Sequence, residues 1–214
     1  MMPGMTIFNA DTEGAAVLFV ATAAISLLGL WVMPAIIRLA ALRPYWLVRN
    51  SEYWRLNSAG FVHANLTHLL LNLLTYYFFA FALERRIGTA HFVALYALGL
   101  LLSNLGTSYR HRNEPDYATL GASGAVCAVL FAAIIYFPTS SLYILPLPVP
   151  IPAPVFAVLY LAYSYYQSRH SPGPINHDAH VGGALTGLAF VAVTNPAAYG
   201  RLLDVIGAWR SGAT

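Results

Sequence analysis

The chain has 214 residues, of which 58% are hydrophobic and 9% are charged. Soluble domains average about 45–50% apolar and about 25% charged residues, so this composition excludes a soluble globular enzyme or a disordered chain and indicates an integral membrane protein. The net charge is +3, and the basic residues are arginines scattered along the chain, which excludes a nucleic-acid-binding surface.

Six segments have the length and apolar character, or nearly so, of a helix that crosses a bilayer, which needs about 20 residues. In chain order they are residues 15–42, 61–83, 92–106, 122–137, 152–167 and 179–194. Several are short, which predicts tilted helices or helices that begin below the membrane surface. We therefore expect an all-α, polytopic membrane protein with a six-helix domain over 15–195, a short N-terminal tail over 1–14 and a short C-terminal tail over 196–214.

Two connections between these segments are unusual. Residues 43–60 form a long polar and aromatic stretch, which predicts an ordered or functional loop. Residues 145–154 alternate proline with apolar residues, a pattern that excludes helix and predicts an extended segment near the membrane interface. No internal repeat is evident, which disfavours an inverted-repeat transporter.

The first 13 residues carry two acids and no basic residue, so we expect no cleaved signal peptide. Six spans put both termini on one side of the membrane. The arginines of the connections mildly favour termini outside the cell, so charge counting does not decide the orientation.

A serine between glycines opens the fourth predicted span, in the sequence Gly121-Ala-Ser-Gly124. Its hydroxyl is accessible, and the free N–H groups of a helix start can hold a developing oxyanion, so Ser123 is a candidate nucleophile. The alternative is packing, because Gly121 begins a stripe of small residues at helical spacing. Ser123 lies about 160° from that stripe, which therefore does not account for it.

A histidine opens the sixth predicted span. His180, Gly183 and Gly187 lie within roughly 60° on one helix face, and the glycines allow that face to approach a neighbouring backbone. An imidazole, with an ordinary pKa of about 6.5, suits general-base catalysis, so His180 is the candidate base. The alternative is a histidine that is hydrogen-bonded to a neighbouring carbonyl.

The second predicted span carries His68 and Asn72, which share one helix face and can both donate hydrogen bonds to an oxyanion. A zinc site needs further ligands, and His63 would point about 140° away on a regular helix. No HExxH motif occurs, so the metalloprotease signature is absent. We expect no metal and no cofactor.

Together these motifs resemble the rhomboid family of intramembrane serine proteases. The resemblance covers about residues 52–191 and rests on five elements in the family's order. They are the Trp54-Arg55 pair, HANLTHLLLN at 63–72, the Glu84-x-Arg86-x-Gly88 turn, GASG at 121–124 and HVGGALTG at 180–187.

The resemblance implies a six-helix bundle with a Ser–His dyad below the membrane surface and both termini in the cytoplasm of a bacterium. By position, it implies that Ser123 is the nucleophile and His180 the base, and that His68, Asn72 and the Ser123 backbone N–H stabilise the oxyanion. It also implies structural roles near the site for Gly121, Gly124, Gly183, Gly187, for the loop residues Trp54 and Arg55, and for Glu84 and Arg86, which would brace the turn after the second span.

One position departs from the family. Some bacterial members carry an aromatic residue four positions after the serine, near the histidine, whereas this chain has Cys127, its single cysteine. His180 is then positioned by different packing. Asp178 lies about 200° around a helix from His180, so no carboxylate is placed to complete a triad, and the group that fixes the imidazole tautomer is not identified.

The expected function is cleavage of transmembrane segments of other membrane proteins within the bilayer, at sites with small or helix-breaking residues. A non-catalytic rhomboid-like protein that binds transmembrane helices is the alternative. A small transporter is expected to carry charged residues in the middle of its spans, and their scarcity here disfavours that function. The sequence does not indicate an oligomeric state.

Overall fold

Nearly all of the regular structure is helical in the computed structural model, which describes residues 11–144, 149–170, 173 and 175–212. The helices are α1 (Glu13–Leu27) with its π-helical continuation η1 (Leu28–Val32), α2 (Ala35–Ala40), α3 (Pro44–Arg49), α4 (Arg55–Ser58) with the 3₁₀ turn η2 (Ala59–Phe61), α5 (Leu66–Ile87), α6 (Thr89–Arg110), α7 (Ser123–Tyr136), α8 (Ala153–His170), α9 (His177–Thr194) and α10 (Ala198–Ser211). Two short strands, β1 (Ser141–Tyr143) and β2 (Pro150–Pro152), pair between α7 and α8. The predicted all-α membrane fold is confirmed.

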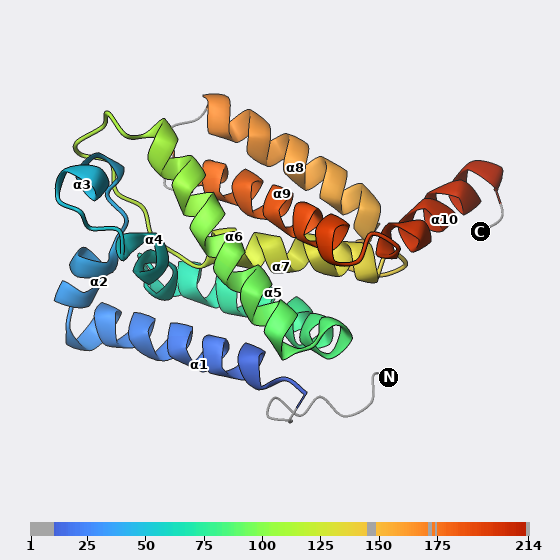
Figure 1. Ribbon diagram of the computed structural model, residues 1–214, viewed down its shortest axis with the longest axis horizontal. Helices are drawn as coiled ribbons and strands as arrows, with labels where there is room; N and C mark the ends of the chain where they lie inside the picture. The colour runs from blue at the N-terminus through green and yellow to red at the C-terminus, as the bar shows by residue number, and fades with distance from the viewer. Residues whose placement is uncertain (1–10, 145–148, 171–172, 174, 213–214) are drawn as a thin grey trace.

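Three helical stretches of the described residues are long and apolar enough to cross a membrane by themselves. They are Glu13–Val32, α5 and α6, and α9 with α10 makes a fourth candidate that is bent by 112°. α7 is apolar but only 14 residues long. Each of the six predicted segments contains a helix, and the start of α1 lies at the same end of the molecule as α10 (Figure 1).

The first predicted span, 15–42, is not one continuous helix, which corrects the prediction. The helix widens into the π turn, and Met33 leaves the helical region at φ −139° and ψ 81°. Pro34 follows, and a proline disfavours the α conformation of the residue before it, so α1 with η1 ends at Val32. The chain resumes as the short helix α2.

α7 occupies the centre of the bundle. Every residue of this helix after Ser123 is buried, and α5, α6, α8 and α9 all contact it. Figure 1 shows α7 (yellow) enclosed by these helices, with α1 along one edge. The stripe of small residues permits this, because a Cβ added at Gly99 of α6 would lie 2.5 Å from the Ala128 Cβ of α7. A central α7 makes its first residue, Ser123, reachable from several helices.

Glu84 connects α5 to the start of α1. Its fully buried carboxylate accepts hydrogen bonds from the backbone N–H groups of Gly14 (2.9 Å) and Ala15 (2.6 Å). Free N–H groups at a helix start favour an acidic partner, so the residue stabilises α1 as well as the end of α5. Arg86 lies over the ring of Tyr136 of α7, at 5.5 Å.

The loop over residues 43–60 is ordered and partly helical. Arg55 is buried and donates to the backbone carbonyls of Arg38, Leu39 and Ala41, which are left free where α2 ends. Its Nε also donates to Glu52, at 2.6 Å. That hydrogen bond, together with the charge of Arg55, lowers the pKa of the Glu52 carboxyl. Trp54 is exposed, with Arg55 against its ring.

The described part of the proline-rich segment is extended, as predicted, except that its last two residues, Ala153 and Pro154, begin α8, which corrects the prediction there. Pro150–Pro152 pairs antiparallel with Ser141–Tyr143, and α8 begins at Ala153. Residues 145–148 lie outside the described residues. The region predicted as a C-terminal tail contains α10.

Candidate active site

Ser123 is the first residue of α7, and a glycine turn sets up its position. Gly121 has φ +117°, a conformation that residues with a side chain rarely adopt. Its N–H donates to the Ala59 carbonyl at 2.8 Å, and a Cβ added to it would lie 2.6 Å from Cε1 of His68. Glycine is therefore required at 121 for two reasons, its positive φ and the lack of space for a Cβ. The His68 ring lies directly against the turn before Ser123.

A fully buried histidine, His63, holds the residue before the serine. The backbone N–H of Ala122 donates to His63 Nε2 at 3.3 Å, so the imidazole proton is on Nδ1. Nδ1–H then donates to Ser26 Oγ at 2.9 Å, and the Ser26 hydroxyl donates to the Phe61 carbonyl at 2.9 Å. From the sequence, His63 was a candidate for metal binding alone. Its structural role becomes visible when α1 and α7 pack beside it.

The helices that carry Ser123 and His180 touch through their glycines. A Cβ added at Gly183 of α9 would lie 2.0 Å from the Gly124 carbonyl oxygen of α7, and one added at Gly187 would lie 2.3 Å from that of Ala128. A Cβ on Gly124 would lie 2.1 Å from Ser103 Oγ of α6. These helices approach at backbone distance, as the glycine spacing predicts.

Ser123 and His180 lie at the same level of this crossing. Gly124 follows Ser123, and an added Cβ on it would lie 3.5 Å from the carbonyl oxygen of Ala179, the residue before His180. Ser123 and His180 make no direct hydrogen bond in the described part of the chain. Catalytic hydrogen bonds are often long before substrate binds, so the lack of a direct hydrogen bond is compatible with a dyad.

His180 is bound by a residue that the sequence did not single out. Its Nδ1 forms a 3.0 Å hydrogen bond with the hydroxyl of Tyr160 on α8, and the two rings are 6.1 Å apart at 23°. The same hydroxyl lies 3.4 Å from Cys127 Sγ. The cysteine thus leaves room for an aromatic residue from another helix. No local pattern marks Tyr160, because it stands in a tyrosine-rich stretch of α8.

His68 and Asn72 lie near the start of α7 but are engaged differently. Asn65 caps α5 by accepting from the His68 N–H at 2.8 Å, and the His68 ring packs edge-on against His63 at 4.9 Å. Asn72 Nδ2 donates to the His68 carbonyl at 2.9 Å, within its own helix. Asn72 and Ala122 line one small cavity. The amide therefore faces α7, and because its NH2 group has two hydrogens, one remains available for an oxyanion while the other bonds His68.

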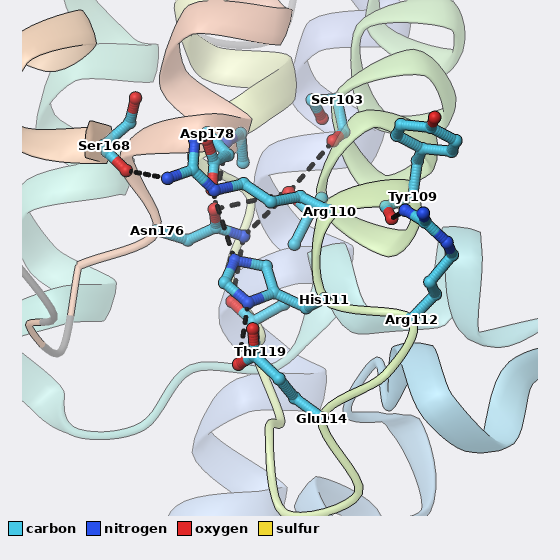
Figure 2. A network of polar contacts seen from close by, with 12 residues as sticks. Ser103, Tyr109, Arg110, His111, Arg112, Glu114, Thr119, Ser168, Asn176 and Asp178 are labelled. Atoms are coloured by element: carbon cyan, nitrogen blue, oxygen red, sulfur yellow. Dashed lines mark hydrogen bonds and ion pairs between the residues drawn. The ribbon is translucent and has the colours of Figure 1, made fainter.

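Asp178 points away from the imidazole that it precedes. Its carboxylate pairs with Arg110 at 3.0 Å and with His111 Nε2 at 3.2 Å, both near the end of α6 (Figure 2). His111 Nδ1 also lies 3.0 Å from Glu114. Asp178 is thus part of a surface network, in keeping with the expectation that no carboxylate completes a triad.

The same network holds the loop that leads into α7. Asn176 caps α9 by accepting from the Ala179 N–H, and its Nδ2 donates to both Thr107 and Thr119 at 3.1 Å (Figure 2). His111 stacks on Tyr117 at 3.7 Å. Burial and the nearby Asp178 charge raise the pKa of the Tyr117 hydroxyl to about 12. The start of α9 and the approach to Ser123 are therefore tied to α6 and to each other.

Comparison with known proteins identifies the family. The rhomboid domain family matches residues 50–196, more than half of the chain, and this chain therefore belongs to the rhomboid family. It is an integral membrane protein of that family.

Its relatives include bacterial rhomboid proteins. Rhomboid protease GlpG of Klebsiella pneumoniae is 30% identical over 153 residues, which are 70% of this chain and 51% of that protein. The rhomboid protein YdcA of Bacillus subtilis is 45% identical over 80 residues, 37% of this chain and 39% of YdcA. Rhomboid protease GluP of the same bacterium is 26% identical over 164 residues, 75% of this chain and 30% of GluP. The chain spans about half or less of the length of these relatives.

Proposed function

We propose that this chain is an intramembrane serine endopeptidase that cleaves transmembrane segments of membrane proteins with a Ser123–His180 dyad. The observation that carries the proposal is the backbone contact between α7 and α9, which brings the first turns of the two helices together beside His68. The naming of GlpG and GluP as rhomboid proteases supports the same activity.

In the proposed mechanism, His180 Nε2 takes the Ser123 hydroxyl proton while Ser123 Oγ attacks the scissile carbonyl carbon. Tyr160 keeps the imidazole in the right tautomer, because its hydroxyl oxygen accepts the Nδ1–H and leaves the lone pair on Nε2. Tyr160 thereby takes the orienting role that an aspartate has in a triad. The same hydroxyl also shares a hydrogen bond with Cys127 Sγ, in which either group can be the donor.

The tetrahedral intermediate needs donors for its oxyanion. The backbone N–H of Ser123 is free at the start of α7, and His68 and Asn72 supply side-chain donors beside it. His180 then protonates the leaving amine as the C–N bond breaks. A water, deprotonated by His180, hydrolyses the acyl-enzyme and restores Ser123. Every step uses side chains of this protein and water.

The substrate must present an extended backbone at the cut. The carbonyls of a transmembrane helix are already hydrogen-bonded, so the helix has to unwind before Ser123 can attack. We infer that substrates carry small or helix-breaking residues near the cleavage site. We also propose residence in a bacterial inner membrane with cytoplasmic termini, which puts the start of α7 nearer the outer face.

A fluorophosphonate probe tests the nucleophile, because it reacts with an activated serine. We expect labelling of the detergent-solubilised protein, and none in Ser123→Ala or His180→Ala. Cleavage of a generic transmembrane test substrate should be lost in the same two variants. Labelling that persists in Ser123→Ala would sink the assignment. A folded wild-type protein that neither labels nor cleaves would favour the non-catalytic helix-binding role.

A further inference from the structure

A groove of about 460 Å³ opens between the outer ends of α6, α8 and α9, apart from the dyad. Its charged and aromatic walls come from the end of α6 and the residues just after it, from the last turn of α8 and from the first turn of α9. The lining residues that matter here are Tyr109, Arg110, Arg112, Tyr165, Arg169 and Asp178. Three arginines thus face one carboxylate, and the volume is in the range of small-molecule sites.

The single acid of the groove is already neutralised. Asp178 pairs with both Arg110 and His111, and Figure 2 shows Arg110 reaching across to it and to the Ser168 carbonyl. Arg110 therefore anchors the wall rather than offering a free charge. Two positive charges, those of Arg112 and Arg169, are left to be matched.

Neither of these two arginines has an acidic partner in the described part of the chain. Arg112 donates to the Tyr109 carbonyl and lies over its ring at 4.3 Å, and Arg169 lies over the ring of Tyr165 at 5.4 Å. Both side chains are exposed. The neighbouring stretch 171–174 contains no acidic residue. The two guanidinium groups are held on tyrosine faces at the mouth of the groove, ready to pair with an external anion.

The groove turns apolar one helical turn below these charges. Gly106 and Val181 also line the groove, and Leu102 and Leu185, each about half exposed, lie four residues further along the same two helices. A ligand that fits both levels has an anionic head and apolar tails. The helix ends of a spanning bundle lie at the level of the lipid headgroups, where tyrosine is favoured.

We propose that this groove binds the phosphate headgroup of an anionic phospholipid through Arg112 and Arg169, with its acyl chains along α6 and α9. Arginine matches a phosphate in charge and geometry, since its planar donors pair with two oxygens at once. A zwitterionic lipid has no net charge and so neutralises less of the positive charge of the two arginines than an anionic lipid does. An acidic peptide matches the charges but not the apolar continuation of the groove.

The test is a binding measurement that needs no proteolysis. The purified full chain in detergent is titrated with dihexanoyl phosphatidylglycerol and, in parallel, with dihexanoyl phosphatidylcholine. We expect the anionic lipid to bind about tenfold tighter or more, since each basic residue near an anionic headgroup contributes about 1 kcal/mol. In Arg112→Gln/Arg169→Gln the two lipids should bind equally.

The matched control removes the same charge elsewhere. Arg49 lies over the Tyr45 ring at 3.7 Å and donates to the Tyr45 carbonyl, much as Arg112 does with Tyr109. Arg49→Gln/Arg201→Gln should therefore keep the full preference for the anionic lipid. Arg112→Lys/Arg169→Lys should keep most of it.

Three results would overturn the proposal. The first is equal affinity of the wild type for both lipids, and the second is the same loss of preference in the control double variant. The third is displacement of the anionic lipid by inorganic phosphate, or by a soluble acidic peptide, at the concentration at which the lipid itself binds. The Tm of each variant without lipid identifies misfolding, and the single variant Arg169→Gln replaces a double variant that does not fold.

Discussion

At the scale of single residues, the surroundings of His180 are formed by side chains from two helices, α7 and α8. A cysteine at 127 leaves the space beside the imidazole to be filled from elsewhere, and the Tyr160 hydroxyl of α8 hydrogen-bonds both the histidine and that cysteine. A hydroxyl can donate or accept, and in the proposed dyad it accepts from Nδ1–H, which leaves the Nε2 lone pair free for the serine proton. Tyr160 is therefore a positioning residue that acts through His180.

Tyr160→Phe keeps the ring and removes that hydrogen bond. If the proposed dyad is correct, we expect kcat to fall about fivefold to tenfold, the value of a hydrogen bond of about 1 kcal/mol, with KM and Tm nearly unchanged. Steady-state cleavage of a transmembrane test substrate measures the split between kcat and KM. Tyr166→Phe, an exposed tyrosine on the same helix, is the control. An equal fall in both variants, or none in Tyr160→Phe, would contradict the role.

At the scale of elements, the contact between α7 and α9 decides whether a site exists. Their glycines allow the backbones to meet, and a methyl group at Gly183 has no space because the nearest atom is a backbone carbonyl oxygen rather than a movable side chain. The two helices must then separate, which also separates the residues at their first turns.

Gly183→Ala is thus expected to destabilise the protein by about 1–3 kcal/mol and to slow fluorophosphonate labelling about a hundredfold. Thermal unfolding in detergent and the labelling rate are the two measurements. Gly207→Ala in α10, where an added Cβ meets nothing within 4 Å, should leave both unchanged or raise the Tm slightly. Wild-type labelling by a Gly183→Ala protein would show that the helices need not touch.

The loop over residues 43–60 has its own pH dependence, through Glu52 and Arg55. The pKa of Glu52 is lowered below 4.5 in the folded protein, so the pair contributes its full stability above that pH and loses it as the pH falls through the folded pKa. We expect Glu52→Gln to lower the Tm by about 1–3 °C at pH 7 and by less near pH 4, where the contribution of the ion pair has begun to fall.

The matched variant is Asp116→Asn, which removes an exposed loop acid that has no ion pair in the described part of the chain. Its Tm should stay close to that of the wild type at both pH values. A Glu52→Gln effect of the same size near pH 4 as at pH 7 would mean that the side chain acts by packing rather than by charge.

At the scale of the whole molecule, charge counting and the fold point in different directions. The arginines of the loops mildly favour termini outside the cell, whereas the proposed orientation has them in the cytoplasm. Several of those arginines are used by the structure itself: Arg55 binds backbone carbonyls at the end of α2, and Arg110 pairs with Asp178. The rule is a bias in the count of basic residues in short loops, so a mild excess does not decide the orientation.

We therefore expect an alkaline phosphatase fusion after Asn113, in the loop before α7, to be active, and one after Gly212 to be inactive. A green fluorescent protein fused after Gly212 should fluoresce, which is the complementary readout. The opposite pattern in both reporters would reverse the proposed orientation and place the start of α7 on the cytoplasmic side.

The sequence by itself determined that the protein lies in a membrane, where its main helices are and which family it resembles. Few charges, apolar runs and motifs such as GASG and HVGGALTG depend only on local composition and spacing, which the chain carries without folding. It also indicated that Gly183 and Gly187 form a contact face, because periodicity places them on one side of a helix. The break at Met33 in the first predicted span, the start of α8 inside the proline-rich segment and the helix α10 in the predicted tail escaped this local reasoning.

The tertiary structure alone decided which residues meet. Tyr160 beside His180, His63 beneath Ala122, Glu84 at the start of α1 and the arginine groove between α6 and α8 all join residues from different helices. Their partners are decided by how the helices pack around α7, which no spacing along the chain encodes. The chemistry of each residue was legible in the sequence, whereas its partner was a property of the packed bundle.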